Sequence, residues 1–181
     1  SYKMHEKTNY ATEVMSWIDH MLVTGHSVMK TYWNPETKQV EFQAIDPMYI
    51  IVPPWSKEIG TADRITQVMP MSLETYKRAG LYDTSESTID RIQSGKIEDS
   101  GIIDNLKYDK EIREGITHSI DKDQIIVWEV YSHDEDGKWV MECFSPQAPD
   151  IPLRDTMEVP FDHDNPPFVS CKYEVTDGGW F

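Results

Sequence analysis

The residue types that could bind a metal ion form two short clusters in this sequence. In the first, Asp134, Asp136 and Gly137 would occupy positions three, five and six of a calcium-binding loop running from Ser132 to Cys143. Such a loop needs a strong ligand at position one and a bidentate Glu at position twelve, but these two positions hold Ser and Cys. The flanking segments also alternate as strands do. The pattern therefore favours a polar hairpin turn over a calcium site.

The second cluster is Asp162-His163-Asp164, which stands among prolines. No second His cluster lies at a ligand spacing, so we interpret this segment as a solvated loop. Cys143 and Cys171 lack the C-x-x-C spacing of zinc and redox sites. Both fall in segments with strand character, where cysteines more often serve as small core residues.

Catalytic signatures are missing from the sequence. It contains no Walker A loop, dinucleotide-binding glycine motif, nucleophile elbow or H-E-x-x-H zinc motif. With thirty-two Asp and Glu residues, a carboxylate pair could still be assembled in space, as in glycoside hydrolases, so a hydrolase stays an open alternative. From the residues we predict no catalytic, cofactor-binding or metal-ligating residue, and no cofactor.

Composition narrows the class of protein. The chain has 181 residues, with 17 Lys and Arg against 32 Asp and Glu, a net charge of −15. This charge excludes a surface that coats nucleic-acid phosphates, because such binding needs clustered basic residues. No segment approaches the roughly 20 apolar residues of a membrane span. An aromatic content of 11% argues against disorder, so we expect an acidic globular protein.

The N-terminal part predicts a helix followed by a hairpin. Apolar residues recur at helical spacing and indicate an amphipathic helix that Asn9 or Thr12 begins and Gly25 ends: Val14, Trp17, Ile18, Met21 and Leu22. Segments 27–33 and 39–45 predict strands joined by a turn at 34–38. A short apolar run at 48–52 follows. We expect the helix to pack on Val40, Phe42, Ile126, Trp128 and Val130.

The middle of the chain is more polar. Segment 62–69 predicts a strand, and a short helix over 73–79 lies between Ser72 and Gly80. Two further helices are predicted, over 85–94 around Ile89 and Ile92, and over 104–115. Because the section 83–122 is polar and charged, we expect it to be exposed or mobile.

The C-terminal third predicts a strand over 124–132, a turn at 133–138 and a partner strand over 139–144. Segment 145–167 holds six prolines and is expected to be an extended surface segment outside any regular element. A last strand is predicted over 168–175. The fold class is therefore α+β, with largely antiparallel hairpins, an N-terminal amphipathic helix and short inserted helices, in a single domain over 1–181.

Several segments together resemble the portal proteins of tailed bacteriophages and prophages. The opening helix leads through Gly25 into a strand with a Gly-x-x-x-x-Lys pattern that ends at Lys30. An Asp-Pro-x-x-Ile-x-Val-Pro segment follows at 46–53, and a Met-Ser-x-x-x-Tyr helix start at 71–76. A strand–turn–strand and a Pro-Phe strand running to Tyr-Glu at 167–174 close the unit. The section 83–122 carries little of the resemblance.

The resemblance implies a structural protein that is not an enzyme. Portal proteins form a ring, usually of twelve subunits, at one capsid vertex in the virion, and are present in the host cytoplasm during assembly. DNA is packaged and ejected through the ring without tight or specific binding. The partners are other copies of the chain, the terminase, and capsid and tail or adaptor proteins, with no membrane.

Within that family this chain would be most of the wing region. The residues Ser1 and Trp180-Phe181 at the ends also led us to expect a fragment, with the stem, clip and crown regions following Phe181. Two alternatives stay open from the residues: a hydrolase that uses paired carboxylates, and an acidic β-rich interaction module unrelated to phage.

Overall fold

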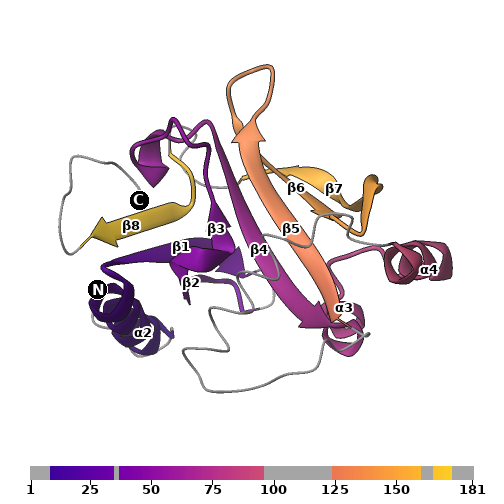
Figure 1. The fold of residues 1–181 in the computed structure, drawn as a ribbon, viewed down its shortest axis with the longest axis horizontal. Helices are drawn as coiled ribbons and strands as arrows, with labels where there is room; N and C mark the ends of the chain where they lie inside the picture. Colours follow the sequence, from indigo (N-terminus) through magenta and orange to yellow (C-terminus); the bar gives the residue numbers. More distant parts are fainter. Residues whose placement is uncertain (1–8, 35–36, 96–123, 160–164, 173–181) are drawn as a thin grey trace. The chain divides into compact units, whose positions relative to one another are not determined.

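The structure is a computed structural model that describes residues 9–34, 37–95, 124–159 and 165–172. Its fold is α+β, as the sequence predicted, with three α-helices and two antiparallel sheets among the described residues (Figure 1). The helices are α2 (Tyr10–Thr24), α3 (Leu73–Ala79) and α4 (Glu86–Ser94). Single 3₁₀ turns are η1 (Pro47–Tyr49) and η2 (Ile59–Thr61).

The strands are β1 (His26–Asn34), β2 (Gln39–Ile45), β3 (Ile50–Ile51), β4 (Arg64–Ser72), β5 (Gln124–His133), β6 (Trp139–Ser145), β7 (Ala148–Glu158) and β8 (Phe168–Lys172). One sheet has the order β2-β1-β8, and the other has the order β3-β4-β5-β6-β7.

The chain divides into two compact units. The first consists of Ser1–Thr66, Tyr131–Met141 and Glu158–Phe181, and the second of Gln67–Val130 and Glu142–Met157. The single domain expected over 1–181 stays a prediction.

In the first unit, α2 and the hairpin that follows it confirm the sequence prediction. Gly25 ends the helix with φ +81°, a left-handed conformation that costs Gly little, and its N–H donates to the carbonyl of Met21 at 2.9 Å. The chain then enters β1, which pairs with β2 from Val28 opposite Ile45 to Asn34 opposite Gln39. On its other side β1 pairs with β8, so a segment from near the C-terminus lies beside the first strand.

The turn after β2 follows from Asp46 and Pro47. The Asp46 carboxylate accepts the N–H of Met48 at 3.1 Å, and Pro47 occupies the first turn of η1. Ile50 and Ile51 then form the short strand β3, which lies within the apolar run identified at 48–52.

In the second unit, α3 and α4 also match their predictions. The hydroxyl of Ser72 accepts the N–H of Thr75 at 3.1 Å and so begins α3, and Gly80 ends it with φ +62°. In α4, Ile89 and Ile92, around which the helix was predicted, are buried. The prediction that the section 83–122 is exposed or mobile is therefore wrong for the face of α4 that carries these two residues. Its residues 96–122, with the helix predicted over 104–115, lie outside the described residues.

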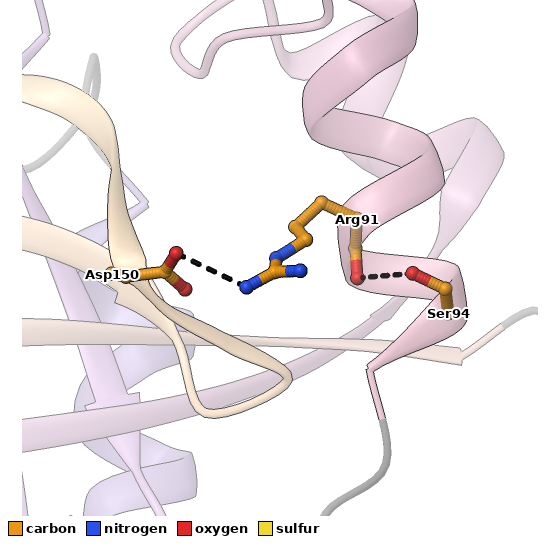
Figure 2. A network of polar contacts seen from close by, with 3 residues as sticks. All are labelled: Arg91, Ser94 and Asp150. Atoms are coloured by element: carbon orange, nitrogen blue, oxygen red, sulfur yellow. Dashed lines mark hydrogen bonds and ion pairs between the residues drawn. The ribbon is translucent and has the colours of Figure 1, made fainter.

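A charged contact links α4 to β7 in the second unit (Figure 2). The guanidinium of Arg91 lies 3.2 Å from the carboxylate of Asp150, and the Ser94 hydroxyl donates to the Arg91 carbonyl at 3.1 Å. Both charged side chains are more than half exposed, so the pair contributes little to stability. It marks where α4 lies beside the strand.

The prediction that 145–167 lies outside any regular element was wrong over 148–158, and 160–164 lie outside the described residues. Residues 148–158 form β7, an eleven-residue strand at the edge of its sheet. Pro149 and Pro152 are exposed. An edge strand tolerates proline because one side of its backbone does not need to donate to a neighbour. Proline breaks helix interiors and central strands, but it does not exclude an edge strand such as β7.

Candidate functional site

The two faces of the three-stranded sheet differ in character. Side chains of residues directly opposed on antiparallel strands point to the same side of a sheet. The register therefore places Lys30 and Phe168 on one face, and Met29, Ala44 and Val169 on the other. We call these the lysine face and the helix face.

Helix α2 packs on the helix face. The ring of Tyr10 meets that of Phe42 edge-on, with centroids 4.9 Å apart. Near the other end of the helix, the sulfur atoms of Met21 and Cys171 lie 3.5 Å apart. The helix therefore contacts β2 through its first turn and β8 through its last turns.

The first turn of α2 also caps the outer edge of β2. The side-chain amide of Asn9 donates to the carbonyl of Phe42 at 2.8 Å, and its oxygen accepts the N–H of Phe42 at 3.3 Å. The Glu13 carboxylate accepts the N–H of Ala44 at 2.6 Å. These side chains thus satisfy backbone groups that a further strand would otherwise pair with. Asn9 precedes the helix, as the sequence predicted, but its side chain bonds to the strand and not to the helix.

Much of the apolar surface of α2 stays exposed. No side chain of the helix is fully buried. Leu22 was predicted to pack in the core with Trp17, but it is 65% exposed, and that prediction was wrong. Leu22 is exposed because it points in a different direction from Trp17. It lies five positions later, which is about 140° around the helix at 100° per residue. The partners predicted on β5, Ile126, Trp128 and Val130, belong to the second compact unit.

The lysine face buries a cation among aromatic rings. Lys30 is only 7% exposed, and its ammonium lies 5.4 Å from the ring centre of Tyr131 and 6.0 Å from those of Tyr32 and Phe168. Tyr131 and Phe168 meet edge-on, with centroids 5.0 Å apart. Such contacts stabilise a desolvated cation through the negative face of each ring.

Sequence reasoning missed this lysine. A signal was present, because strand alternation puts Lys30 on the same side of β1 as Val28, which is fully buried. The rings of Tyr131 and Phe168 come from β5 and β8, and only the tertiary fold brings them to β1.

The second unit contains a tyrosine pair next to a carboxylate. Tyr76 and Tyr82 stack with ring centres 5.1 Å apart, and the Tyr76 hydroxyl donates to the Asp83 carbonyl at 2.7 Å. Burial raises the pKa of Tyr76 to about 12, with a further contribution from the Asp83 charge. The pKa of Tyr82 is also raised, mainly by burial and to a smaller extent by the charge of Glu129. Both phenols therefore stay protonated at neutral pH; their rings stack on one another, and the Tyr76 hydroxyl also acts as a donor.

The Asp83 carboxylate organises the start of α4. It accepts the hydroxyl of Thr88 at 2.7 Å, and the N–H and hydroxyl of Ser85 at 2.9 and 3.0 Å. These hydrogen bonds, that from Thr88 first, lower the pKa of Asp83. The sequence prediction placed a helix start at Ser85 but did not identify this carboxylate.

The candidate calcium loop is a hairpin turn between β5 and β6, as the sequence analysis favoured. One oxygen of Asp134 accepts the N–H groups of Asp136 and Lys138 at 3.0 and 2.8 Å. Gly137 has φ +80° and donates to the Asp134 carbonyl at 3.1 Å. The carboxylate expected at loop position three thus organises its own turn.

The remaining candidate ligands do not come together in the described ranges. Across 9–34, 37–95, 124–159 and 165–172, no three His, Cys, Asp or Glu side chains are grouped as a metal site requires. Cys143 is buried on β6, as expected for a core residue, and Cys171 is half-buried on β8. The segment Asp162-His163-Asp164 lies outside the described residues.

Comparison with known proteins gave no match: no protein-family model and no curated protein corresponds to the chain. Among the described helices, none combines the length and the apolar character needed to cross a membrane. Within the described residues, the candidate functional feature is the exposed side of α2, which carries Met15, Leu22 and Val23.

Proposed function

We propose that this chain is part of a structural subunit of a phage or prophage portal ring, within the wing region. In that role it contributes to the conduit at one capsid vertex through which DNA is packaged and ejected, and to which the tail attaches. The role requires packing and interaction surfaces and no catalytic residue.

One observation carries the proposal: the motifs that resemble portal proteins fall at structural junctions and follow one another in the expected order. Gly25 joins α2 to β1, Asp46 begins η1, and Ser72 begins α3. The strand–turn–strand segment forms β5 and β6, and Phe168 begins β8. A chain in which the same short motifs serve as caps and turns is consistent with the wing of that family.

The exposed side of α2 is also consistent with this role. Subunits of an assembly need apolar surface that is covered only when the assembly forms. Met15, Leu22 and Val23 are all more than 60% exposed on this one helix. The observation applies equally to an acidic interaction module unrelated to phage, so the test must separate these two functions.

Immunogold electron microscopy makes that separation. Antibodies raised against this chain are applied to particles from the phage or induced prophage that encodes it, after the capsids are opened to admit the antibody. A portal subunit gives gold at a single vertex of each capsid. Label over the whole shell, on the tail alone or absent from particles would contradict the proposal. Antibody from non-immune serum is the control.

A further inference from the structure

We propose that the outward side of α2 docks an amphipathic helix with basic flanks from a partner protein. The docking surface is a stripe of four residues, which we call the outer stripe: Ala11, Met15, Ile18 and Leu22. This proposal does not depend on the portal function, because it is argued from α2 and from the charge of the chain.

The outer stripe is a second apolar face on a helix that already has one. Tyr10 and Met21 contact the sheet and mark the first face. The outer stripe lies about 100° around the helix from it, since each residue turns the helix by 100°. A surface helix of a globular protein needs one apolar face to pack on its sheet. The exposed part of the second face, at Met15 and Leu22, is therefore surplus to the packing of this unit.

Spacing and exposure fit a helical occupant. The four residues follow one another at intervals of four, three and four, which is the seam spacing of helices that pack side by side. Met15 and Leu22 are 62% and 65% exposed, Ala11 is exposed, and Ile18 is half-buried. The stripe extends for about 16 Å along the axis, or three turns of a partner helix. Met adapts its flexible side chain to such partners.

Charge determines which helix fits. Asp19 is exposed four residues after Met15 and three before Leu22, so its carboxylate borders the stripe. Helix α2 contains no Lys or Arg, and the whole chain carries −15. Lysine or arginine on the flanks of a partner helix would therefore be attracted, and acidic flanks would be repelled.

A second copy of this chain is a poorer occupant. Two copies with −15 each repel one another at low ionic strength. Four stripe residues also fall well short of the roughly 20–30 residues per side of a standard interface. The surface suits a short helical segment in a weak, exchangeable complex.

The test uses two synthetic 18-residue helical peptides and the 181-residue chain. Both peptides carry Leu at heptad positions a and d; one has Lys at the flanking e and g positions, and the other has Glu there. Fluorescence anisotropy of the labelled peptide is measured near 0.1 M salt. We expect the Lys peptide to bind and the Glu peptide to show no binding at the same concentrations.

Two variants separate docking on the stripe from general attraction of a basic peptide to an acidic protein. The double variant Met15→Gln and Leu22→Gln removes apolar contacts from the stripe and is expected to lower the affinity about tenfold or more. Val23→Gln is the matched control: it is on the same helix, 72% exposed and about 100° away, and it should change the affinity less than about twofold. All three positions are exposed, so circular dichroism is expected to show unchanged folding.

Amide chemical shifts of the unaltered chain give an independent readout, with changes expected at the four stripe residues. Several results would overturn the proposal: no binding of the Lys peptide up to about 1 mM, equal binding of the Glu peptide, equal losses in both variants, or shifts centred elsewhere. A dimer of the chain that Leu22→Gln abolishes would also overturn it, because the occupant would then be a second copy.

Discussion

Gly95 ends α4 at a place where a side chain would collide with the backbone of a neighbouring segment. A Cβ atom added there would overlap the carbonyl oxygen of Gln147, so one of the two segments would have to move. The N–H of Gly95 also donates to the carbonyl of Arg91 at 2.9 Å and so closes the last turn of α4. The need for glycine here comes from close packing, since its φ of −68° suits any residue.

We expect Gly95→Ala to lower the free energy of unfolding by about 1–3 kcal/mol, as overpacking typically does. Gly60→Ala is the control, because an added Cβ there meets nothing within 4 Å, and it should change stability by less than about 0.5 kcal/mol. Urea denaturation of the chain measures both. Equal stability of the two variants would show that Gly95 and Gln147 do not pack as described.

Tyr76 and Tyr82 make the stability of the folded chain sensitive to alkaline pH. Burial raises the pKa of Tyr76 to about 12, and it raises that of Tyr82 as well, from an ordinary value of 10.0. A raised pKa in the folded state means that the protonated form stabilises the fold. This contribution is complete below pH 10 and is lost as the pH rises through the folded-state pKa.

Absorbance at 295 nm, which follows tyrosinate formation, should therefore show a group of tyrosines that ionise only above about pH 11 in the folded chain. In denaturant all nine tyrosines should ionise together near their ordinary value. Loss of structure is expected to accompany the late phase. Tyr76→Phe should make this phase smaller. A single phase near pH 10 in the folded chain would contradict the burial of the pair.

At the scale of elements, α2 has two tasks in the first unit: it covers the helix face of the sheet and caps the edge of β2. The Asn9 side chain pairs with the backbone of Phe42 as a neighbouring strand would, because it donates to the Phe42 carbonyl and accepts the Phe42 N–H. Uncapped edges invite pairing with other chains, so these contacts protect the hairpin as well as hold the helix.

Asn9→Ala should lower the free energy of unfolding by about 0.5–1.5 kcal/mol, the usual effect of losing a hydrogen-bonding group, measured by urea denaturation. Asn9→Asp keeps the acceptor for the Phe42 N–H but sets a carboxylate oxygen against the Phe42 carbonyl, so this variant should also be less stable than the original chain. If both variants were as stable as the original chain, the first turn of α2 would not be held on β2 as described. Increased aggregation of Asn9→Ala would agree with an unprotected edge.

Elements with a local signal could be predicted from the sequence. Gly25, Ser72 and Gly80 each act through their own backbone or a neighbour three or four residues away, and the helices that they bound were predicted correctly. The strand β7 could not be predicted by the same reasoning. Whether a proline is tolerated there depends on the strand being at a sheet edge, which no local pattern records.

The surroundings of Lys30 were less predictable than the fold because the residues that form them are distant in sequence. Lys30 meets Tyr131 and Phe168 only once β1 pairs with β8. The exposure of Leu22 is a different case. The helical period already places Leu22 away from Trp17, but the sequence prediction assigned all the apolar residues of the helix to one wide face.

At the scale of the whole molecule, the charge of −15 bears on whether the chain binds DNA. In the proposed role the chain should not bind the polymer that passes through the ring, and an acidic surface releases no counterions from DNA phosphates. We expect no binding of the chain to duplex DNA near 150 mM salt. Fluorescence anisotropy with labelled duplex is the measurement, and a dissociation constant in the micromolar range would contradict this expectation.

The central claim is that this chain belongs to a ring-forming structural subunit. The protein encoded by the full reading frame should therefore assemble into a ring. Its subunits should meet through heterologous contacts, in which one patch of a subunit contacts a different patch on the next. The portal assignment implies that the stem and clip lie outside these 181 residues, and like charges repel. On that assignment the chain of 181 residues should stay a monomer or weak oligomer at micromolar concentration and low salt. Raising the salt should weaken this repulsion.

The most direct test is sedimentation velocity of the purified full-length product, together with electron microscopy of the same sample. We expect one large species that corresponds to a closed ring, usually of twelve subunits in the portal family, while the 181-residue chain alone sediments as a monomer or weak oligomer. A full-length product that stays monomeric over the micromolar range, with no rings in the images, would contradict the assignment.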